Sequence, residues 1–477
     1  MKRGLALIAC CALPSCVVPC PPPAAPPPCP ACAPCECAAT APPVVTATPP
    51  SQPPLVVAGE PPPEPSPQTV VVPAQSDWLQ FQGDAARWGR SSAPALRRPV
   101  IRWKARVGIQ GYLNTPLVSG PTVFVPSSGN THNASDPRDG IHAIDLATGK
   151  PRWHTRFQSD ANGAALAGDR LVATSDDGNV YGLDASRGTV VWKRRGQGKV
   201  YSQPAIVDDL VVVGDAQGFV RAYAWADGTE RWVLQMNGAI RGGLASDGTH
   251  LYAVSQGGEV AALTKGGQVR WRKNVDRPAF SGGRSVPIEG FAAPIVTGNT
   301  VVVPFARDTT YDDPAFVALD ARTGAVQWRA KDRSKEHWGN VRSTPALVDG
   351  LLVYAEPYSG DVAAIEASSG RVRYRQPVGE CYFPHYASAA SAGDLVYVPR
   401  FDGRLYAVEA ATGRVVWQMY LGEASQAGSA SPYRRAGTSC SWEVNSGSPL
   451  YSPVAVAADG TVIVGNGGGT VFAIGGQ

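Results

Sequence analysis

The sequence predicts an all-β fold, an eight-bladed β-propeller with four-stranded antiparallel blades. A glycine precedes an aromatic residue by four positions in seven related segments, and an eighth aromatic stands in a similar strand without the turn. Successive aromatics lie 39 to 57 residues apart along the 477-residue chain. Repeats of about 40 residues that each hold four short strands are typical of propeller blades.

The clearest repeat is the strand–turn–strand segment at residues 143–153, Ala-Ile-Asp-Leu-Ala-Thr-Gly-Lys-Pro-Arg-Trp. The Asp side chain accepts backbone N–H bonds in a tight turn, and the Gly adopts a positive φ. The Trp presents a large flat face between neighbouring sheets. We therefore predict a structural docking motif made of Trp103, Asp145, Gly149, Trp153, Asp184, Gly188, Trp192, Gly228, Trp232, Gly267, Trp271, Asp320, Gly324, Trp328, Gly370, Tyr374, Gly413 and Trp417.

The third repeat shows the expected strands of one blade most clearly. Its Val-rich runs lie at residues 205–207, 210–214, 219–223 and 230–233, separated by Asp-Asp, Gly and Asp-Gly turns. Short β-branched runs with turn residues at strand-length intervals predict antiparallel strands. No helical period competes with this pattern.

The two ends of the repeat region complement each other. The last repeat supplies three strands, at 454–456, 461–464 and 471–474, and lacks the aromatic-bearing fourth strand. A strand around Trp103 can supply it, so we expect pairing of the N- and C-terminal strands to close the ring. Closure also removes an exposed sheet edge.

The first residues indicate export. A charged start and a short apolar run over residues 1–9 are typical of a secretory signal and too short for a stable transmembrane span. Leu-Pro-Ser-Cys at 13–16 resembles a bacterial lipoprotein cleavage site, which predicts a signal peptide at 1–16 and a lipid on Cys16. Cys10 is an alternative lipid site, and secretion without a lipid is another alternative.

Residues 17–77 are rich in Pro, Ala and Cys, and we expect a disordered linker there. Proline runs favour an extended spacer, whose reach would exceed about 100 Å. The cluster of Cys29, Cys32, Cys35 and Cys37 lacks a folding nucleus, which favours disulfides or biased composition over a zinc site. Cys381 and Cys440 are candidates for a disulfide in an oxidising compartment.

The net charge of +4 is too small to indicate a nucleic-acid partner. The arginines are spread at about one per strand, which favours a solvated outer face over a basic patch.

The pattern Ala-x-Asp-x-x-x-Gly-x-x-x-Trp resembles the tryptophan-docking motif of the pyrroloquinoline-quinone (PQQ) repeat family. The resemblance covers residues 78–477 and implies that family's eight-bladed propeller. It implies two kinds of function, because the family includes PQQ- and calcium-dependent dehydrogenases and also the BamB-like outer-membrane assembly lipoproteins, which hold no cofactor.

The polar residues expected at the mouth of the central channel favour the second kind. The quinoprotein dehydrogenases carry an adjacent cysteine pair at the cofactor, whereas Cys381 and Cys440 are far apart in sequence. A calcium site usually includes carboxylates, and Glu289 is the single carboxylate in this funnel. The funnel residues are Asn114, Thr115, Ser202, Gln203, Arg241, Glu289, Asn340, Arg342, Ser343, His385, Ser388 and Ser452.

We therefore predict a non-catalytic scaffold of the cell envelope that binds a protein partner such as an outer-membrane β-barrel. No catalytic, cofactor-binding or metal-binding residue is expected. A PQQ- and calcium-dependent periplasmic dehydrogenase and a ligand-binding sensor propeller remain the alternatives. Cys381 and His385 could form a nucleophile pair, but a disulfide or plain packing is the favoured interpretation of those residues. Insertions at 129–139, 276–290 and 307–314 are candidate partner-contact loops.

Overall fold

In the computed structural model, the described residues are 77–111, 113–275, 290–305, 314–331, 341–356, 360–378, 387–422 and 449–477. Contacts divide the chain into residues 1–65 and 66–477, and every described residue lies in the second unit. The assigned elements of this part are all strands. It contains no helix long and apolar enough to cross a membrane.

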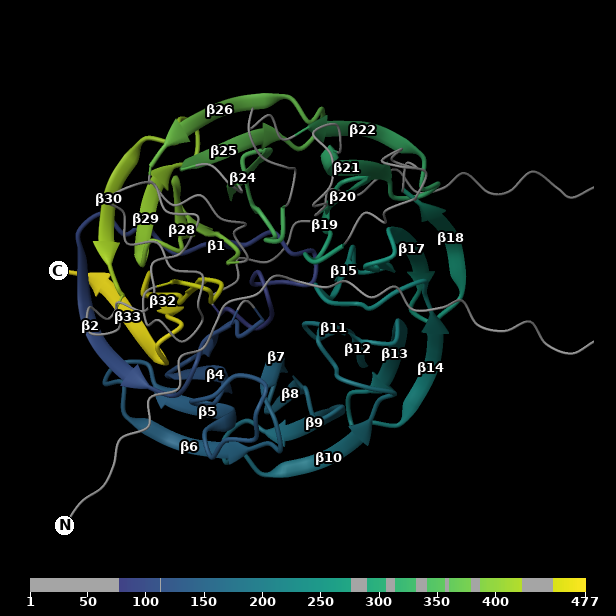
Figure 1. Ribbon diagram of the computed structural model, residues 1–477, viewed down its shortest axis with the longest axis horizontal. Coiled ribbons are helices and arrows are strands. Elements are labelled where there is room, and N and C mark those ends of the chain that lie inside the picture. Colours follow the sequence, from purple (N-terminus) through teal and green to yellow (C-terminus); the bar gives the residue numbers. More distant parts are fainter. Residues whose placement is uncertain are drawn as a thin grey trace, which may run out of the picture. The chain divides into compact units, whose positions relative to one another are not determined.

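The strands form eight sheets, one for each predicted blade (Figure 1). Blade one holds β3 (Leu117–Ser119), β4 (Thr122–Ser128), β5 (Asp139–Asp145) and β6 (Pro151–Arg156). Blade two holds β7 (Ala161–Ala167), β8 (Arg170–Ser175), β9 (Asn179–Asp184) and β10 (Val190–Arg195). Blade three holds β11 (Ala205–Val207), β12 (Leu210–Gly214), β13 (Phe219–Ala224) and β14 (Glu230–Gln235). Blade four holds β15 (Leu244–Ser246), β16 (His250–Val254), β17 (Glu259–Thr264) and β18 (Val269–Asn274).

The remaining blades repeat this order. Blade five holds β19 (Ile295–Thr297), β20 (Thr300–Pro304), β21 (Pro314–Asp320) and β22 (Val326–Lys331). Blade six holds β23 (Ala346–Val348), β24 (Leu351–Ala355), β25 (Asp361–Glu366) and β26 (Val372–Pro377). Blade seven holds β27 (Ala390–Ala392), β28 (Leu395–Pro399), β29 (Arg404–Glu409) and β30 (Val415–Tyr420), and β1 (Arg90–Ser91) pairs in parallel with β27. Blade eight holds β31 (Ala455–Val456), β32 (Val462–Gly465), β33 (Thr470–Gly476) and β2 (Pro99–Arg106).

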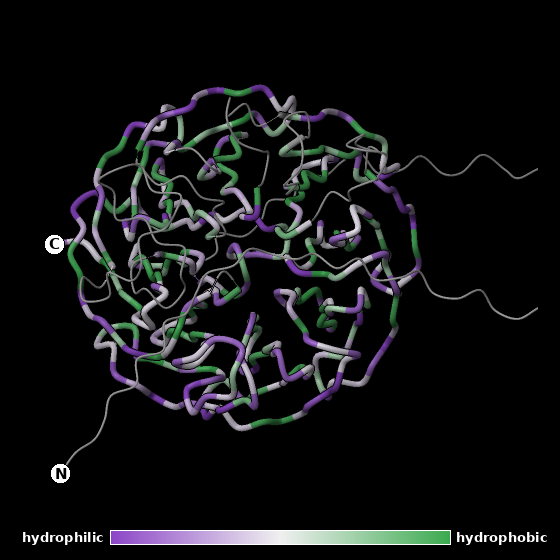
Figure 2. Tube along the Cα trace, in the orientation of Figure 1, coloured by the Kyte–Doolittle hydropathy of each residue, from purple (hydrophilic) through white to green (hydrophobic). Residues whose placement is uncertain are grey.

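Burial separates the first three strands of a blade from the fourth. The Val-rich β12 is buried along its whole length, whereas β14 alternates between exposed and half-buried residues. The fourth strands lie on the circumference in Figure 1, where their trace alternates between hydrophilic and hydrophobic residues (Figure 2). The core therefore lies between the inner three strands of neighbouring blades.

The predicted ring closure is confirmed. β2, from the N-terminal side of the repeats, pairs antiparallel with β33 at the C-terminal side, with Lys104 opposite Phe472. One hydrophobic cluster extends across this junction from Trp103 to Ile474. The last blade is thus built from strands that lie more than 350 positions apart in the sequence.

The docking motif links each outer strand to the next blade. A Cβ atom added to Gly149 would lie 2.7 Å from the Trp103 ring, and Gly149 has a φ of +71°. The Trp103 indole also donates a hydrogen bond of 2.7 Å to the Leu146 carbonyl. Close approaches of the same kind join Trp153 to Gly188, Trp192 to Gly228, Trp232 to Gly267, Trp271 to Gly324, Trp328 to Gly370 and Tyr374 to Gly413.

The Asp of the motif holds its turn as expected. Asp145 Oδ1 accepts hydrogen bonds from the backbone N–H and the hydroxyl of Thr148, at 3.0 and 2.8 Å. Asp320 binds Thr323 in the same way, and Asp184 binds Ser186. The indole of Trp417 has a different partner, because it donates to the Leu96 carbonyl at 2.6 Å.

The segment before β2 forms a belt, residues 77–96, along the inner strands. Its backbone bonds, together with the Gln80 side chain, follow the blades in numerical order. Trp78 bridges to Val118 of blade one, and the Gln80 side chain bonds Ile206 of blade three. Carbonyls of Leu79, Ala85, Ala86, Trp88 and Gly89 accept hydrogen bonds from amides of blades two, four, five, six and seven, namely Leu166, Ser246, Val296, Leu347 and Ser391.

Two fully buried side chains hold the belt from opposite sides of the ring. Arg87 donates to the carbonyls of Leu244 and Pro204, in blades four and three, at 2.8 and 3.1 Å. Gln82 donates to carbonyls of blades six and seven, including that of Ala389 at 3.0 Å. The belt therefore ties together blades that are not neighbours.

Candidate functional site

The funnel residues that the structure describes lie near the starts of the inner strands, and most are buried. Asn114 donates to the Ala161 carbonyl of blade two at 2.6 Å, and its own carbonyl accepts from Ser452 of blade eight at 2.9 Å. The Gln203 amide donates to the Leu113 carbonyl. These side chains therefore use their hydrogen bonds to join blades.

The hydroxyl residues of the funnel bond within one blade or between two blades. Ser202 accepts from the Gly214 amide at 2.6 Å, and Ser388 of blade seven accepts from the Thr344 amide of blade six at 2.9 Å. Thr115 and Ser343 are also buried. The hydroxyls of Ser202 and Ser388 thus bind backbone amides of the protein.

Two arginines and two aromatic residues continue the funnel across four consecutive blades. Arg241 lies 4.4 Å from the centre of the Tyr201 ring and 5.7 Å from that of Phe291. Arg342 lies 4.6 Å from the Phe291 ring centre. Cation–π contacts at these distances hold guanidinium groups against ring faces.

Several predicted site residues lie outside the described part of the chain. They are Cys10, Cys16, Cys29, Cys32, Cys35, Cys37, Glu289, Asn340, Cys381, His385 and Cys440. The disulfide and the lipid site therefore stay predictions. Within the described ranges, no three His, Cys, Asp or Glu side chains come together as a metal site requires.

The blade-one insertion and the described ends of the other two predicted partner-contact loops share one face of the propeller. In a four-stranded antiparallel blade, the connection between the second and third strands and the connection to the next blade leave from the same end. Backbone bonds from Phe157 to Asp139 and from Val341 to Phe305 join these two kinds of connection. The insertion at 129–139 and the described residues on either side of 276–289 and 306–313 therefore belong to one face, here called the insertion face.

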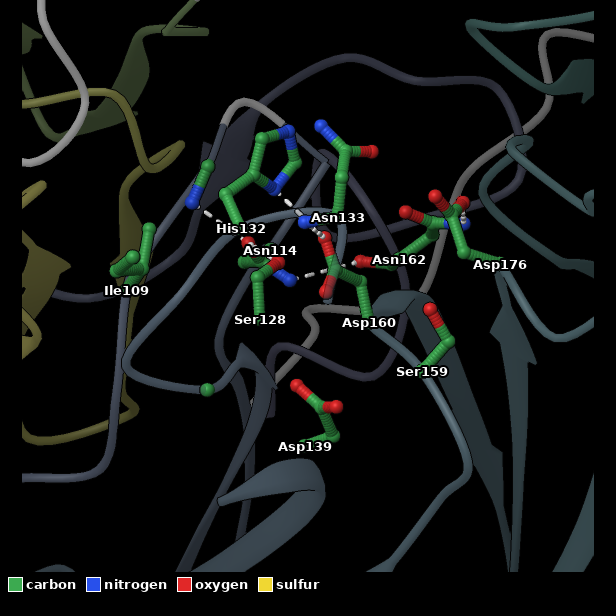
Figure 3. A network of polar contacts seen from close by, with 12 residues as sticks. Ile109, Asn114, Ser128, His132, Asn133, Asp139, Ser159, Asp160, Asn162 and Asp176 are labelled. Carbon is green, nitrogen blue, oxygen red and sulfur yellow. Dashed lines mark hydrogen bonds and ion pairs between the residues drawn. The ribbon is translucent and has the colours of Figure 1, made fainter. Parts of the chain in front are cut away.

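The insertion in blade one is fixed by a polar network (Figure 3). The His132 Nδ1 atom lies 2.6 Å from Asp160 Oδ2, and the Asn133 amide donates to the same oxygen at 3.1 Å. Asp176 accepts from Asn162 at 2.8 Å and from Lys199 at 2.6 Å. The network thus links the insertion to blade two and to the connection that leads into blade three.

The protonation of this network follows from burial and pairing. The hydrogen bond to Asp160 raises the pKa of His132 above its ordinary value. Burial raises the pKa of Asp139 to about 6. Burial also lowers the pKa of His142 to about 4, and the His142 ring stacks on that of His154 at 4.0 Å. Pairing with Asp160 thus favours the protonated form of His132, and burial favours the protonated form of Asp139.

Sequence reasoning identified the insertion but not its anchor. His132 precedes Asp160 by 28 positions, and no local spacing rule connects them. Within the belt, Trp78 and Phe81 are buried, but the hydrogen bonds of the belt to seven blades had no sequence signal.

Comparison with known proteins identifies a family and several relatives by sequence. The family model described as outer membrane protein assembly factor BamB matches residues 138–239 and 216–382, together just over half of the chain. The BamB of Yersinia pestis is 23% identical over 304 residues, covering 59% of this chain and 62% of that protein. The BamB of Shewanella oneidensis is 26% identical over 275 residues, covering 53% of this chain and 66% of that protein. The chain thus matches slightly less than two thirds of the length of these relatives.

Solved structures share the fold at low identity. The crystal structure of BamB from Moraxella catarrhalis aligns with a TM-score of 0.57 at 14% identity, covering 79% of this chain and 99% of that one. A quinohemoprotein alcohol dehydrogenase from Comamonas testosteroni aligns with a TM-score of 0.61 at 14% identity, covering 85% and 81%. These two likenesses show the fold alone, whereas the family model rests on the sequence of the blades. By that match the chain belongs to the family of the outer membrane protein assembly factor BamB.

Proposed function

We propose that this protein is a non-catalytic scaffold of the cell envelope that binds other proteins as a BamB-like outer-membrane assembly factor. The observation that carries the proposal is the family match over residues 138–382. Fold alone would not distinguish a scaffold from an enzyme, because propellers host many functions.

The local geometry supports a scaffold over a cofactor enzyme. Several described funnel side chains bond to other blades, as Asn114, Gln203 and Ser388 do. The insertion face includes the blade-one insertion, which His132 bonds to Asp160 at the start of blade two. A fixed loop is better suited to contact a partner than one that must be ordered on binding. We infer that the insertion face contacts the partner and that no PQQ or calcium is required.

Anchoring by a lipid completes the proposal. Cys16, with Cys10 as the alternative, would carry the lipid after removal of the signal peptide. The linker at 17–77 would then tether the propeller to the outer membrane, on its periplasmic side. The partner would be an outer-membrane β-barrel or a protein bound to it.

Cross-linking in native membranes tests the partner and the face together. Lys199 lies on the connection between blades two and three, on the insertion face. Lys150 and Lys265 lie in turns between third and fourth strands, at the opposite end of the blades. With a tagged full chain and an amine-reactive cross-linker, we expect an outer-membrane β-barrel protein joined through Lys199 and not through Lys150 or Lys265. Recovery of no envelope protein would contradict the scaffold, and linkage through Lys150 alone would contradict the assigned face.

Calorimetric titration of the full chain with PQQ and calcium addresses the enzyme alternative. We expect no saturable heat at high micromolar PQQ. One-to-one binding that is lost on Glu289→Ala would overturn the non-catalytic assignment.

A further inference from the structure

The outer strands on one side of the ring are strongly basic. β2, β6 and β10, from the adjacent blades eight, one and two, carry eight Arg and Lys residues and no Asp or Glu. The sequence suggested about one arginine per strand and no basic patch, and that expectation is wrong for these three strands. The residues of this cationic arc are Arg102, Lys104, Arg106, Arg152, Arg156, Lys193, Arg194 and Arg195.

Turns next to these strands neutralise only part of the charge. Arg102 pairs with Asp459 at 2.8 Å and Arg152 with Asp145 at 2.6 Å. Lys104 forms no ion pair with any described residue; its ammonium lies 5.4 Å from the centre of the Phe472 ring. Positive charge therefore remains on the surface of the arc.

A groove of about 200 Å³ opens at one end of this arc, between β30 of blade seven and β2 of blade eight. Lys104 and Arg106 stand on one side and Tyr420 on the other, and no acidic residue among those that the structure describes lines it. Its described lining is Lys104, Ala105, Arg106, Tyr420, Leu421, Gly422, Thr470 and Phe472. We call it the seam groove.

Tyr420 distinguishes the seam groove from ordinary protection of an outer strand. Charged residues on edge strands discourage edge-to-edge association, which accounts for cations on outer strands in general. That rule does not account for an aromatic ring that stays 40% exposed beside them. Arg404 lies 5.7 Å from the Tyr420 ring centre and helps to hold the ring in place.

The seam between blades one and two provides an internal comparison. Lys193 and Arg195 occupy the same register as Lys104 and Arg106, and Lys193 lies 4.8 Å from the Tyr181 ring centre. Blade one, however, places Arg156 where blade seven places Tyr420, three residues after the docking tryptophan. The two seams thus carry the same pair of cations, but the residue facing that pair is Tyr420 in one seam and Arg156 in the other.

We propose that the seam groove binds the phosphate of an anionic phospholipid headgroup and docks this side of the propeller on a membrane surface. The groove has room for a phosphate but not for a bulky ligand, and its cations match that charge. Tyr420 has an apolar ring and a polar hydroxyl, a combination that suits the interface between headgroups and water. This inference goes beyond the proposed scaffold function, and its failure would leave that function standing.

Vesicle flotation tests the proposal with the full chain carrying Cys10→Ser and Cys16→Ser, so that neither cysteine can hold a lipid. We expect binding to vesicles with about 30% phosphatidylglycerol and none to pure phosphatidylcholine. Lys104→Gln with Arg106→Gln should weaken binding at least about tenfold. Tyr420→Ser should weaken it without changing the charge. The matched control is Lys193→Gln with Arg195→Gln, which removes the same two charges at the same register.

The outcomes decide the proposal. A larger loss for the seam-groove pair than for the control pair supports a built site. Equal losses would show only diffuse attraction and would overturn the site, as would an absence of binding to phosphatidylglycerol. Saturable binding of inorganic phosphate with no binding to vesicles would overturn membrane docking. Each variant should melt at the temperature of the parent chain, because all the altered side chains are exposed or line an open groove.

Discussion

The indole of Trp103 packs directly against Gly149. Its Cδ2 atom lies 2.7 Å from the position that a Cβ atom of residue 149 would occupy, which is too close for a side chain there. Trp103 belongs to blade eight and Gly149 to blade one, so this contact bridges the point at which the ring closes. The glycine is required twice, once for its φ of +71° and once for the space that the ring occupies. The turn and the inter-blade packing thus depend on the same residue.

Gly149→Ala is expected to destabilise the protein by about 2–5 kcal/mol, because backbone strain and overpacking add. The matched control is Gly168→Ala, at a φ of +56° with no atom within 4 Å of the new Cβ. That variant carries the strain alone and should lose about 1 kcal/mol. Urea unfolding of both variants gives the difference. Equal losses would mean that the Trp103 contact contributes nothing.

The repeat spacing was sufficient to predict the blades, because each docking turn is local in sequence. The register of Trp103 and the three strands of the last repeat were sufficient to predict closure, since an incomplete blade needs a fourth strand. The belt was not predictable in this way. Residues 77–96 bond mainly through backbone carbonyls, which any sequence supplies, to strands up to about 300 positions away.

The candidate site was predictable only in part, for a related reason. The funnel residues were located from their place before the inner strands, but their hydrogen bonds to neighbouring blades depend on the closed ring. Likewise, each cation of the arc was visible in its own strand. Only the ring brings β10, β6 and β2 together, because β2 precedes the first repeat yet completes the last blade.

Arg87→Met is expected to cost about 3–5 kcal/mol of unfolding free energy. The fully buried guanidinium donates to the carbonyls of Phe81, Asp84, Pro204 and Leu244, which would lose their donor with no water to replace it. Faster hydrogen exchange at the amides that bond the belt would localise the loss. Arg90→Met is the control, because Arg90 is exposed and should change stability by less than about 0.5 kcal/mol. Similar costs for both would contradict a specific role of Arg87.

Asp139→Asn is expected to change how stability depends on pH. Burial raises the Asp139 pKa from 3.8 to about 6, so between these pH values the folded state binds its proton more tightly than the unfolded state. Stability from this group therefore falls as pH rises through that window, and Asn should remove the fall. In urea unfolding at pH 4 to 7.5, the unfolding free energy of Asp139→Asn should increase relative to that of the parent protein as pH rises.

Asp145→Asn is the control with the opposite sign. The side-chain bond from Arg152 lowers the Asp145 pKa to about 2, so its contribution is present above 3.8 and is lost as pH falls toward 2. This variant should be less stable than the parent at pH 7.5 and should approach it only when urea unfolding is extended from pH 4 toward pH 2. If both variants shift in the same direction, the assignment of burial to Asp139 and pairing to Asp145 is wrong.

His132→Gln is expected to loosen the insertion face at acidic and neutral pH but not at alkaline pH. Its bond to Asp160 raises the His132 pKa above 6.5, so the stability it contributes is fully present below 6.5 and is lost as pH rises through the folded-state pKa. The loss should stay below about 1 kcal/mol, because the His132 side chain is 44% exposed. Urea unfolding of parent and variant from pH 5.5 to 9 measures the difference, which should shrink toward zero with rising pH.

His154→Gln separates pairing from burial in the same experiment. Burial lowers the His154 pKa, so the unfolded state takes up its proton first as pH falls below 6.5, and the parent protein is weakened there. As pH falls, the parent should therefore lose stability relative to His154→Gln. This trend is opposite to the one expected for His132→Gln, where the parent gains stability relative to the variant as pH falls. Parallel trends would show that His132 responds to burial rather than to Asp160. In that case the insertion would need a different anchor, and Lys199 with Asp176 would be the next pair to remove, because it joins the same network at 2.6 Å.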